Sequence, residues 1–249
     1  MEDNNRNKGL FFGIIAIATL IVAIIGATFA YFSASVGTAN DAVNFTSFDF
    51  SASISVEKIA PAGAIGNLIP VLENVVEQGE TEESSTGTLV QLLNNVPNNG
   101  ICIDAKGYAS CVLYHITINN NSINALTLSG KLVTENGGNF QNLRAQFVTG
   151  TTGNYALAGD SIEIDETTDA KTTLTNPTSG SNGNFTVAAQ TPGVGDGDPT
   201  PGTSEFYLVI YLNDTDSPQT NEMGQTFVGE LEFESTTGTQ GKLTAQITA

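Results

Sequence analysis

The sequence predicts a mainly β protein: an antiparallel, jelly-roll-like β-sandwich with a short helical insertion, preceded by one hydrophobic helix at the N-terminus. Three observations lead to this fold class. The body of the chain is rich in Thr, Asn, Ser and Gly and poor in the long side chains that a helical bundle needs. From Tyr114 onward, short apolar or alternating segments recur between Asn- and Gly-rich turns. No helical stretch separates these segments, which indicates antiparallel pairing.

The charge of the chain excludes one class of partner. Its 249 residues include 8 Lys and Arg against 26 Asp and Glu, a formal net charge of −18. No basic patch is available to neutralise phosphates, so nucleic acid is not an expected partner. The length after an export segment is sufficient for one β-sandwich domain, expected over residues 31–249.

The N-terminal segment predicts contact with a membrane. Leu10–Phe32 is an uncharged apolar run of about 23 residues, long enough to span hydrocarbon as a helix. Arg6 and Lys8 precede it and should stay on the cytoplasmic side, so the rest of the chain should face outward. The chain is therefore expected outside the cell or at its surface.

Three fates are open for this segment. Small residues around Ala30 suit signal-peptide cleavage, so residues 1–30 are either a cleaved signal or a retained single-pass anchor. Cleavage after Gly9 would instead leave the apolar helix in a filament core, as in pilins. In each case the membrane is a partner at least during export.

The first strand is expected in residues 45–56, where apolar and polar side chains alternate. Its apolar positions are Phe48, Phe50, Ala52, Ile54 and Val56. A half-buried strand requires this period of two, because successive side chains point to opposite faces.

Residues 57–100 differ in composition and predict a helical insertion that caps one end of the sandwich. Helices are expected at Ile65–Val76, with Pro70 in its first turn, and at Thr88–Val96. An acidic stretch at residues 79–85 separates them. The alternative interpretation is a partner-binding excursion, because loops on rigid scaffolds often carry function.

The two cysteines predict a disulfide bond. Cys102 and Cys111 flank a polar turn centred on Asp104–Tyr108, and an exported chain meets oxidising conditions. In the loop-entropy treatment such a bond contributes roughly 2.7 kcal/mol. The alternatives are a metal site and a reactive thiol, but two cysteines without nearby histidines do not make a zinc site.

The remaining strands follow at regular intervals. Phe206–Leu212 is the strongest apolar run after the N-terminal segment and should be a central strand. The others are expected at Tyr114–Ile118, Ala125–Val133, Leu143–Val148, Ser161–Asp165, Phe185–Ala188, Phe227–Glu234 and Leu243–Thr248.

A family resemblance lies at the two ends of the chain. Gly26–Ser33 followed by Asn44–Ser51, and Tyr207–Tyr211 followed by Gln219–Phe227, resemble the TasA/camelysin family. Ala34 differs from the Asp common in that family's motif. The resemblance covers about a third of the chain by our reading of the motifs.

The resemblance implies export and assembly into extracellular fibres of biofilm matrix. In that family an N-terminal segment of one subunit adds as a strand to the next. The corresponding donor residues here are Tyr31, Phe32, Val36, Val43 and Phe45. The stretch from Tyr31 to Phe45 reaches roughly 50 Å if extended, far enough to contact a neighbouring copy.

The sequence contains no motif of a known catalytic site. The only histidine, His115, lies within a predicted strand and no nucleophile elbow accompanies it, so an enzyme is not expected. Calcium is a candidate ligand, because Asp196 with Asp198, and Asp214 with Asp216, place hard oxygen ligands on turns. The competing interpretation is turn formation by these residues. No other cofactor is expected.

The sequence thus predicts a non-enzymatic extracellular structural protein that self-associates into fibres by β-strand addition. Two alternatives stay open. One is a monomeric, membrane-anchored surface adhesin or binding module, and the other is a pilin-like subunit that keeps its hydrophobic helix.

Overall fold

The computed structural model describes residues 43–47 (backbone only), 50–62, 68–71, 88–94, 100–177, 183–193, 197–236 and 241–249. The chain divides into two units, Met1–Thr38 and Ala39–Ala249, and all described residues belong to the second. Leu10–Phe32, the predicted membrane segment, lies outside them. Within these ranges no helix is both long and apolar enough to cross a membrane.

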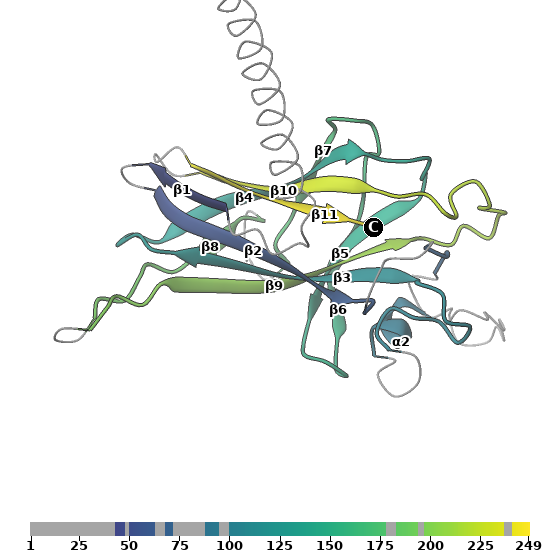
Figure 1. Cartoon of the computed structure of the whole chain (residues 1–249), viewed down its shortest axis with the longest axis horizontal. Coiled ribbons are helices and arrows are strands. Elements are labelled where there is room, and N and C mark those ends of the chain that lie inside the picture. The colour runs from purple at the N-terminus through teal and green to yellow at the C-terminus, as the bar shows by residue number, and fades with distance from the viewer. Residues whose placement is uncertain are drawn as a thin grey trace, which may run out of the picture. The chain divides into compact units, whose positions relative to one another are not determined.

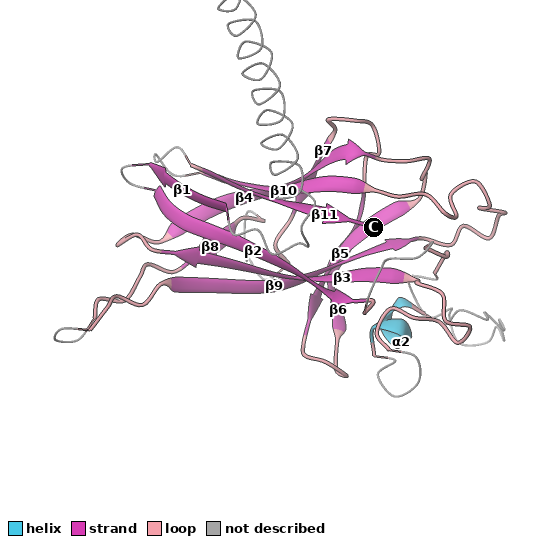
Figure 2. Cartoon of the chain, viewed as in Figure 1, coloured by secondary structure: helices cyan, strands magenta, loops and turns pink. Residues whose placement is uncertain are grey.

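The second unit is mainly β, as predicted, and its strands form two antiparallel sheets (Figures 1 and 2). The first sheet has the order β1-β2-β3-β9-β5-β6. The apolar run predicted as a central strand is β9, which pairs with β3 on one side and β5 on the other, so this prediction is confirmed. The strands are β1 (Val43–Ser47), β2 (Phe50–Ala60), β3 (Cys111–Asn120), β5 (Leu143–Thr149), β6 (Ala156–Glu163) and β9 (Gly202–Leu212).

The second sheet has the order β11-β10-β4-β7, and β8 also pairs with β4. Its strands are β4 (Leu126–Asn136), β7 (Lys171–Leu174), β8 (Phe185–Val187), β10 (Val228–Ser235) and β11 (Lys242–Thr248). The chain crosses between the sheets from β3 to β4, β4 to β5, β6 to β7, β8 to β9 and β9 to β10. Each of these connections joins a strand of one sheet to a strand of the other, and both sheets contribute apolar side chains to the same core.

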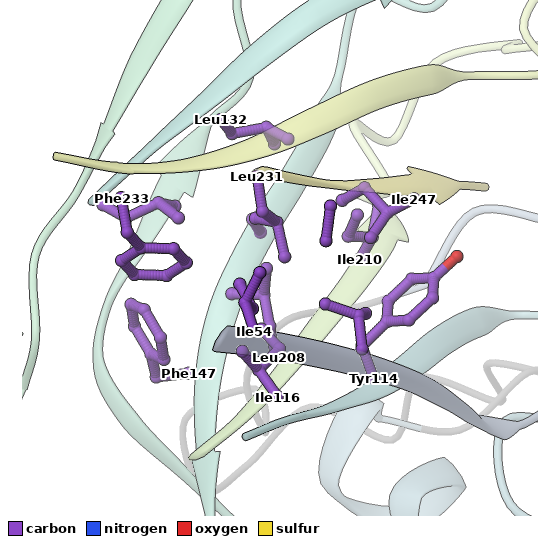
Figure 3. Packing of buried hydrophobic residues seen from close by; sticks show 14 of the residues in the cluster. Ile54, Tyr114, Ile116, Leu132, Phe147, Leu208, Ile210, Leu231, Phe233 and Ile247 are labelled. Carbon is purple, nitrogen blue, oxygen red and sulfur yellow. The ribbon is translucent and has the colours of Figure 1, made fainter. Parts of the chain in front are cut away.

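The main core lies between the two sheets. Ile54, Ile116 and Leu208 come from the first sheet and are fully buried. Leu231 and Phe233 of β10 approach them from the second sheet (Figure 3). These residues belong to one continuous cluster, which shows that the sheets pack face to face as a sandwich.

The first predicted strand is in fact a hairpin. Phe50, Ala52, Ile54 and Val56 are buried in β2, as the alternation predicts. Residues 43–47, however, form a separate strand that pairs back on β2. The prediction of a single strand over 45–56 was therefore wrong. In the register of the hairpin, odd-numbered positions of β1 lie opposite even-numbered positions of β2, so the period of two changes phase at the two-residue connection. The predicted strand followed the even-numbered positions throughout and so missed the turn.

The helical insertion is shorter than predicted. β2 continues to Ala60, and of the predicted helix at Ile65–Val76 the structure describes Leu68–Val71, which are not helical. Val71 instead makes a parallel bridge with Asn213 at the end of β9. The predicted helix at Thr88–Val96 is present as α2 (Leu89–Leu93).

A capping box begins α2: the Thr88 side chain accepts the Gln91 N–H and the Gln91 side chain accepts the Thr88 N–H. Leu89, Leu92 and Leu93 of this helix are buried in a second apolar cluster. That cluster also contains Leu113 of β3 and Val209 of β9, whose side chains leave the first sheet on the face opposite the main core. The insertion therefore covers one end of the outer face of this sheet.

A tyrosine ties the two sheets together. The Tyr114 hydroxyl on β3 donates to the Thr248 carbonyl on β11 and accepts the Thr248 N–H at 2.9 Å. The side chain is almost fully buried, with 1% exposed. Burial raises the pKa of the Tyr114 phenol, although its bonds with Thr248 lower it in part.

Tyr114→Phe is expected to lower the free energy of unfolding by about 1–2 kcal/mol at neutral pH, because both bonds to Thr248 are lost. Urea unfolding measures this loss. Because the pKa of Tyr114 is raised in the folded state, its contribution to stability is fully present below the ordinary tyrosine pKa of about 10. This contribution is lost as the pH rises through the folded-state pKa. The difference between the two proteins should therefore narrow in alkali. Equal stability at neutral pH would contradict a contribution from the tie.

Candidate functional site

The candidate site is the outer edge of the first sheet, where β2 extends past Val43, the first described residue of β1. β1 pairs with β2 only from Phe50 to Ile54. β2 continues to Ala60 and pairs with β3 along its other side. On the β1 side, the structure describes no strand opposite the last part of β2. This part of the edge is open within the described residues.

The direction of the backbone groups along β2 can be assigned. The Ser51 carbonyl accepts the N–H of Asn121, at the end of β3, at 2.7 Å, so Ser51 faces β3. Backbone groups alternate in direction along an antiparallel strand. Ala52, Ile54 and Val56 therefore direct their N–H and C=O groups away from β3. β1 lies opposite Ala52 and Ile54, whereas Val56 directs its backbone N–H and C=O to the open edge.

A cavity lies where this edge ends. Its volume is about 550 Å³. Most of its wall is apolar or glycine, and Ile59 and Ala60 of β2 contribute to it. The other lining residues are Ala62, Gly100, Ile101, Ile103 and Gly107. An open strand edge beside an apolar cavity suits an extended peptide, since the edge binds the backbone and the cavity can take a side chain.

The disulfide hairpin builds one wall of the cavity. Cys102 and Cys111 are bonded, with their Cα atoms 4.9 Å apart, and both are fully buried. Inside the loop, the Asp104 carboxylate accepts the N–H groups of Lys106 at 2.9 Å and Tyr108 at 2.7 Å. The Cys102 N–H donates to the carbonyl of Leu92 in α2 at 3.0 Å. The hairpin is thus attached to both α2 and β3.

The predicted donor residues divide into two groups. Val43 and Phe45 lie in β1, opposite Ile54 and Ala52 of the same chain. Tyr31, Phe32 and Val36 lie outside the described residues. In the single chain, then, the described part of the predicted donor segment is an edge strand of its own sheet.

The opposite edge of this sheet, β6, is less suited to adding a strand. Its pairing with β5 changes register between Ala145 and Phe147. Gly159 within β6 has a positive φ of 68°. Such an irregularity bends an edge strand and discourages further pairing. We therefore place the candidate site at β1 and β2.

The candidate calcium ligands lie at separate places. Asp198 precedes β9, whereas Asp214 and Asp216 follow it, so the eleven residues of β9 separate the two groups. The Asp214 carboxylate accepts the Asp216 N–H at 3.0 Å, which forms a local turn. Asp196 lies outside the described residues. Among those described, no three acidic, His or Cys side chains gather as a metal site. Calcium binding stays a prediction.

His115 lies on the outer face of the first sheet. Its ring stacks on Tyr207 of β9, with centroids 4.7 Å apart. Its Nε2 is 3.6 Å from the nearer carboxylate oxygen of Glu205. Glu57 of β2 lies directly opposite in the strand register. These neighbours place His115 in a row of paired side chains across the sheet.

Comparison of the chain with protein-family models, with curated proteins and with solved structures finds no match. The resemblance to the TasA/camelysin family accordingly stays a prediction from the sequence motifs.

The sequence did not reveal the open edge. Glu57 and Lys58 interrupt the alternation after Val56, so the predicted strand ended there, four residues before β2 does. The apolar pair Ile59 and Ala60 was a usable signal, because it resumes the strand pattern and lines the cavity.

Proposed function

We propose that this chain is a non-enzymatic, exported structural protein whose copies assemble into extracellular fibres by exchanging an N-terminal strand. The function rests on one observation. β1, the strand nearest the predicted export segment, is a five-residue edge strand that pairs, among the described strands, with β2 on one side and is joined to it by a two-residue connection. A short edge strand that pairs on one side has fewer ladder bonds to break than a central strand, which favours exchange of the strand between copies.

In the assembled state, β1 of one copy would take the place of β1 on the next copy. The register would be the same, with Val43 opposite Ile54 and Phe45 opposite Ala52, because both copies have identical sequences. The contact is heterologous: each copy gives a strand at one place and receives one at another. Such contacts continue into open fibres unless the rotation between copies closes a ring.

The open part of β2 supports this proposal. Residues of the incoming chain before Val43 would continue along β2 past Val56 towards the cavity at Ile59 and Ala60. Tyr31, Phe32 and Val36 are the apolar residues that this continuation offers. In a single chain, the residues before Val43 can pair with β2 in the same register. Exchange therefore forms the same strand pairing between copies, and its free-energy cost is small once β1 has left its own sheet.

The finer architecture and the location belong to the same proposal. The repeated crossings between sheets support a jelly-roll-like connectivity, and Leu10–Phe32 supports export with the hydrophobic helix as signal or anchor. Apolar edge strands are aggregation sites when uncontrolled. Release of the segment only after export would restrict assembly to the outside of the cell.

An engineered lock tests strand exchange. Asn44 and Ser53 are opposite each other in β1 and β2. Their backbone groups point away from each other, and in such pairs the Cα atoms are about 4.5 Å apart, a distance suited to a disulfide. The full-length protein carrying Asn44→Cys and Ser53→Cys, oxidised as monomers, should form no fibres because β1 cannot leave its own sheet.

Reduction of the locked protein should restore fibres. Negative-stain microscopy measures both states, and the single variant Ser53→Cys is the control for effects of reductant. Fibres of equal number from the locked monomers would contradict strand exchange. If the wild-type protein forms no fibres in any condition, the anchored monomeric adhesin becomes the better interpretation.

A further inference from the structure

The outer face of the second sheet carries an ordered set of opposite charges. β10 presents Glu230, Glu232 and Glu234 there, because Leu231 and Phe233 between them point into the core. Lysines lie on both sides of this row. We call the lysine–glutamate face the set Lys131, Lys171, Lys242, Glu230, Glu232 and Glu234, from strands β4, β7, β11 and β10.

Glu232 is the centre of the set. Its side chain is 2% exposed, and its carboxylate lies 2.7 Å from the Nζ of Lys242, 3.2 Å from that of Lys171 and 3.9 Å from that of Lys131. Lys131 is also 2.7 Å from Glu234. Each lysine keeps a solvent-exposed part, with 50% of the Lys171 side chain and 46% of the Lys242 side chain accessible.

The ionic state of the central pair follows from these contacts. Burial acts to raise the pKa of Glu232, but the bonds from Lys242 and Lys171 outweigh it, and the pKa is lowered. The hydrogen bond with Glu232 raises the pKa of Lys242. Both groups are therefore charged at neutral pH, and the rows of opposite charge are maintained there.

The balance of charge on this face differs from that of the rest of the chain. Three lysines match three glutamates, so the set contributes nothing to the net charge of −18. Glu135, at the margin on β4, adds one negative charge and accepts the Gln246 side-chain N–H at 3.1 Å. Two copies of so acidic a chain repel each other across most approaches. Repulsion is weakest where positive and negative groups are equal in number.

The face is also self-complementary. A glutamate row on β10 lies between lysines on β4 and β7 and a lysine on β11. Consider a second copy that faces this sheet, is related to it by a two-fold axis and is shifted across the strands by one strand spacing, about 4.8 Å. Its glutamate row then lies over the lysines of the first copy. Small side chains such as Thr173 and Thr186 surround the charges and allow close approach. The sheet area is about 700 Å² per copy from strand length and spacing, near the ~800 Å² of standard interfaces.

We propose that the lysine–glutamate face is a contact through which two copies of this chain pack sheet against sheet. The proposal deepens the self-association of the proposed function, but it uses a different surface. Strand exchange joins copies along the edge of the first sheet, whereas this contact joins them through the outer face of the second. The partner is a second copy of the same chain.

Zero-length cross-linking tests this contact. A carbodiimide couples a carboxylate to an amine only when the two touch. Full-length protein is prepared with ¹⁴N and with ¹⁵N, and the two are mixed before coupling, so that links between copies carry both isotopes. We expect mixed-isotope peptides that join Lys171 or Lys242 to Glu230 or Glu234. They should decrease several-fold at about 1 M salt, where the Debye length is about 3 Å.

A variant of the face sharpens the test. Thr173→Glu with Thr186→Glu adds two negative charges to the outer face of the second sheet and leaves every residue of the lysine–glutamate face in place. It should reduce the mixed-isotope links at least several-fold. Thr151→Glu with Thr215→Glu, at exposed positions that follow β5 and β9 of the first sheet, makes the same change in net charge and should leave them unchanged. Thermal unfolding of both variants verifies that they are folded.

Links of a single isotope alone, or mixed links that persist in Thr173→Glu with Thr186→Glu, would overturn the contact. Microscopy of the same samples separates this result from the proposed function. Fibres without mixed-isotope links overturn the face contact and leave strand exchange standing. Mixed-isotope links without fibres support the face contact and count against strand exchange.

Discussion

Phe45→Pro is expected to abolish fibre formation while leaving the sandwich folded. Phe45 lies in the middle of β1 opposite Ala52, and both direct their backbone groups toward each other. Proline removes the Phe45 N–H and so removes a ladder hydrogen bond from β1 in any copy to which it pairs. β1 is an edge strand, so the rest of the sheet does not depend on it. Negative-stain microscopy of fibres and urea unfolding of monomers measure the two effects.

Asn44→Pro is the matched control. Asn44 lies opposite Ser53, whose backbone groups face β3, so the Asn44 N–H points away from β2. An edge strand tolerates proline at such a position. The control variant should form at least half as many fibres as the wild-type protein when fibres are counted by negative-stain microscopy. Equal fibre formation by Phe45→Pro and wild type would show that β1 pairing is not the contact between copies.

Replacement of both cysteines, Cys102→Ala with Cys111→Ala, is expected to lower the free energy of unfolding by about 2–4 kcal/mol. The bond closes the hairpin that forms a wall of the cavity, and Cys102 connects this hairpin to α2 through Leu92. Without the bond the unfolded chain gains conformational freedom, and the second apolar cluster loses two buried sulfur atoms. Urea unfolding measures the loss.

Ser110→Ala is the control for changes within the same hairpin. Ser110 is buried beside Cys111, and its hydroxyl donates to the Tyr108 carbonyl over a long distance of 3.5 Å. It keeps the disulfide and should lose less than about 1 kcal/mol. If the double cysteine variant lost no more free energy of unfolding than Ser110→Ala, the hairpin would be held by its packing and not by the covalent bond.

Strands that bury one full face could be predicted from the sequence. β9 and β10 were placed to within four residues at each end, because Phe206–Leu212 is continuously apolar and Phe227–Glu234 alternates strictly. The same holds for β5 and β11. In each, the burial that stabilises the strand is also what makes its pattern visible.

Strands with few buried side chains were misplaced or missed. β7 buries only Thr172 and Leu174, and its polar sequence Lys-Thr-Thr-Leu resembles a turn. β6 was expected at Ser161–Asp165 but lies at Ala156–Glu163, where no side chain is fully buried. Pairing with a neighbouring strand, which is a tertiary effect, decides the position of such segments.

The candidate site was predictable only in part. Val43 and Phe45 were expected in a segment for strand addition, and the structure places them at a sheet edge. The open end of β2 was missed, because it depends on where β1 begins relative to the end of β2, which only strand pairing decides. The rows of charge around Glu232 were also hidden, since Lys131, Lys171 and Lys242 lie far apart in sequence and meet only through strand pairing.

The most direct test of strand exchange is the position of β1 inside an assembled fibre. Full-length protein with Asn44→Cys and Ser53→Cys is assembled under reduction, then oxidised and separated on a non-reducing denaturing gel. The exchange predicts a ladder of covalent multimers, because the thiol introduced in β1 of one copy meets the thiol introduced in β2 of the next. Oxidised monomers alone, from fibres of normal appearance, would show that β1 stays in its own chain and would contradict the proposal.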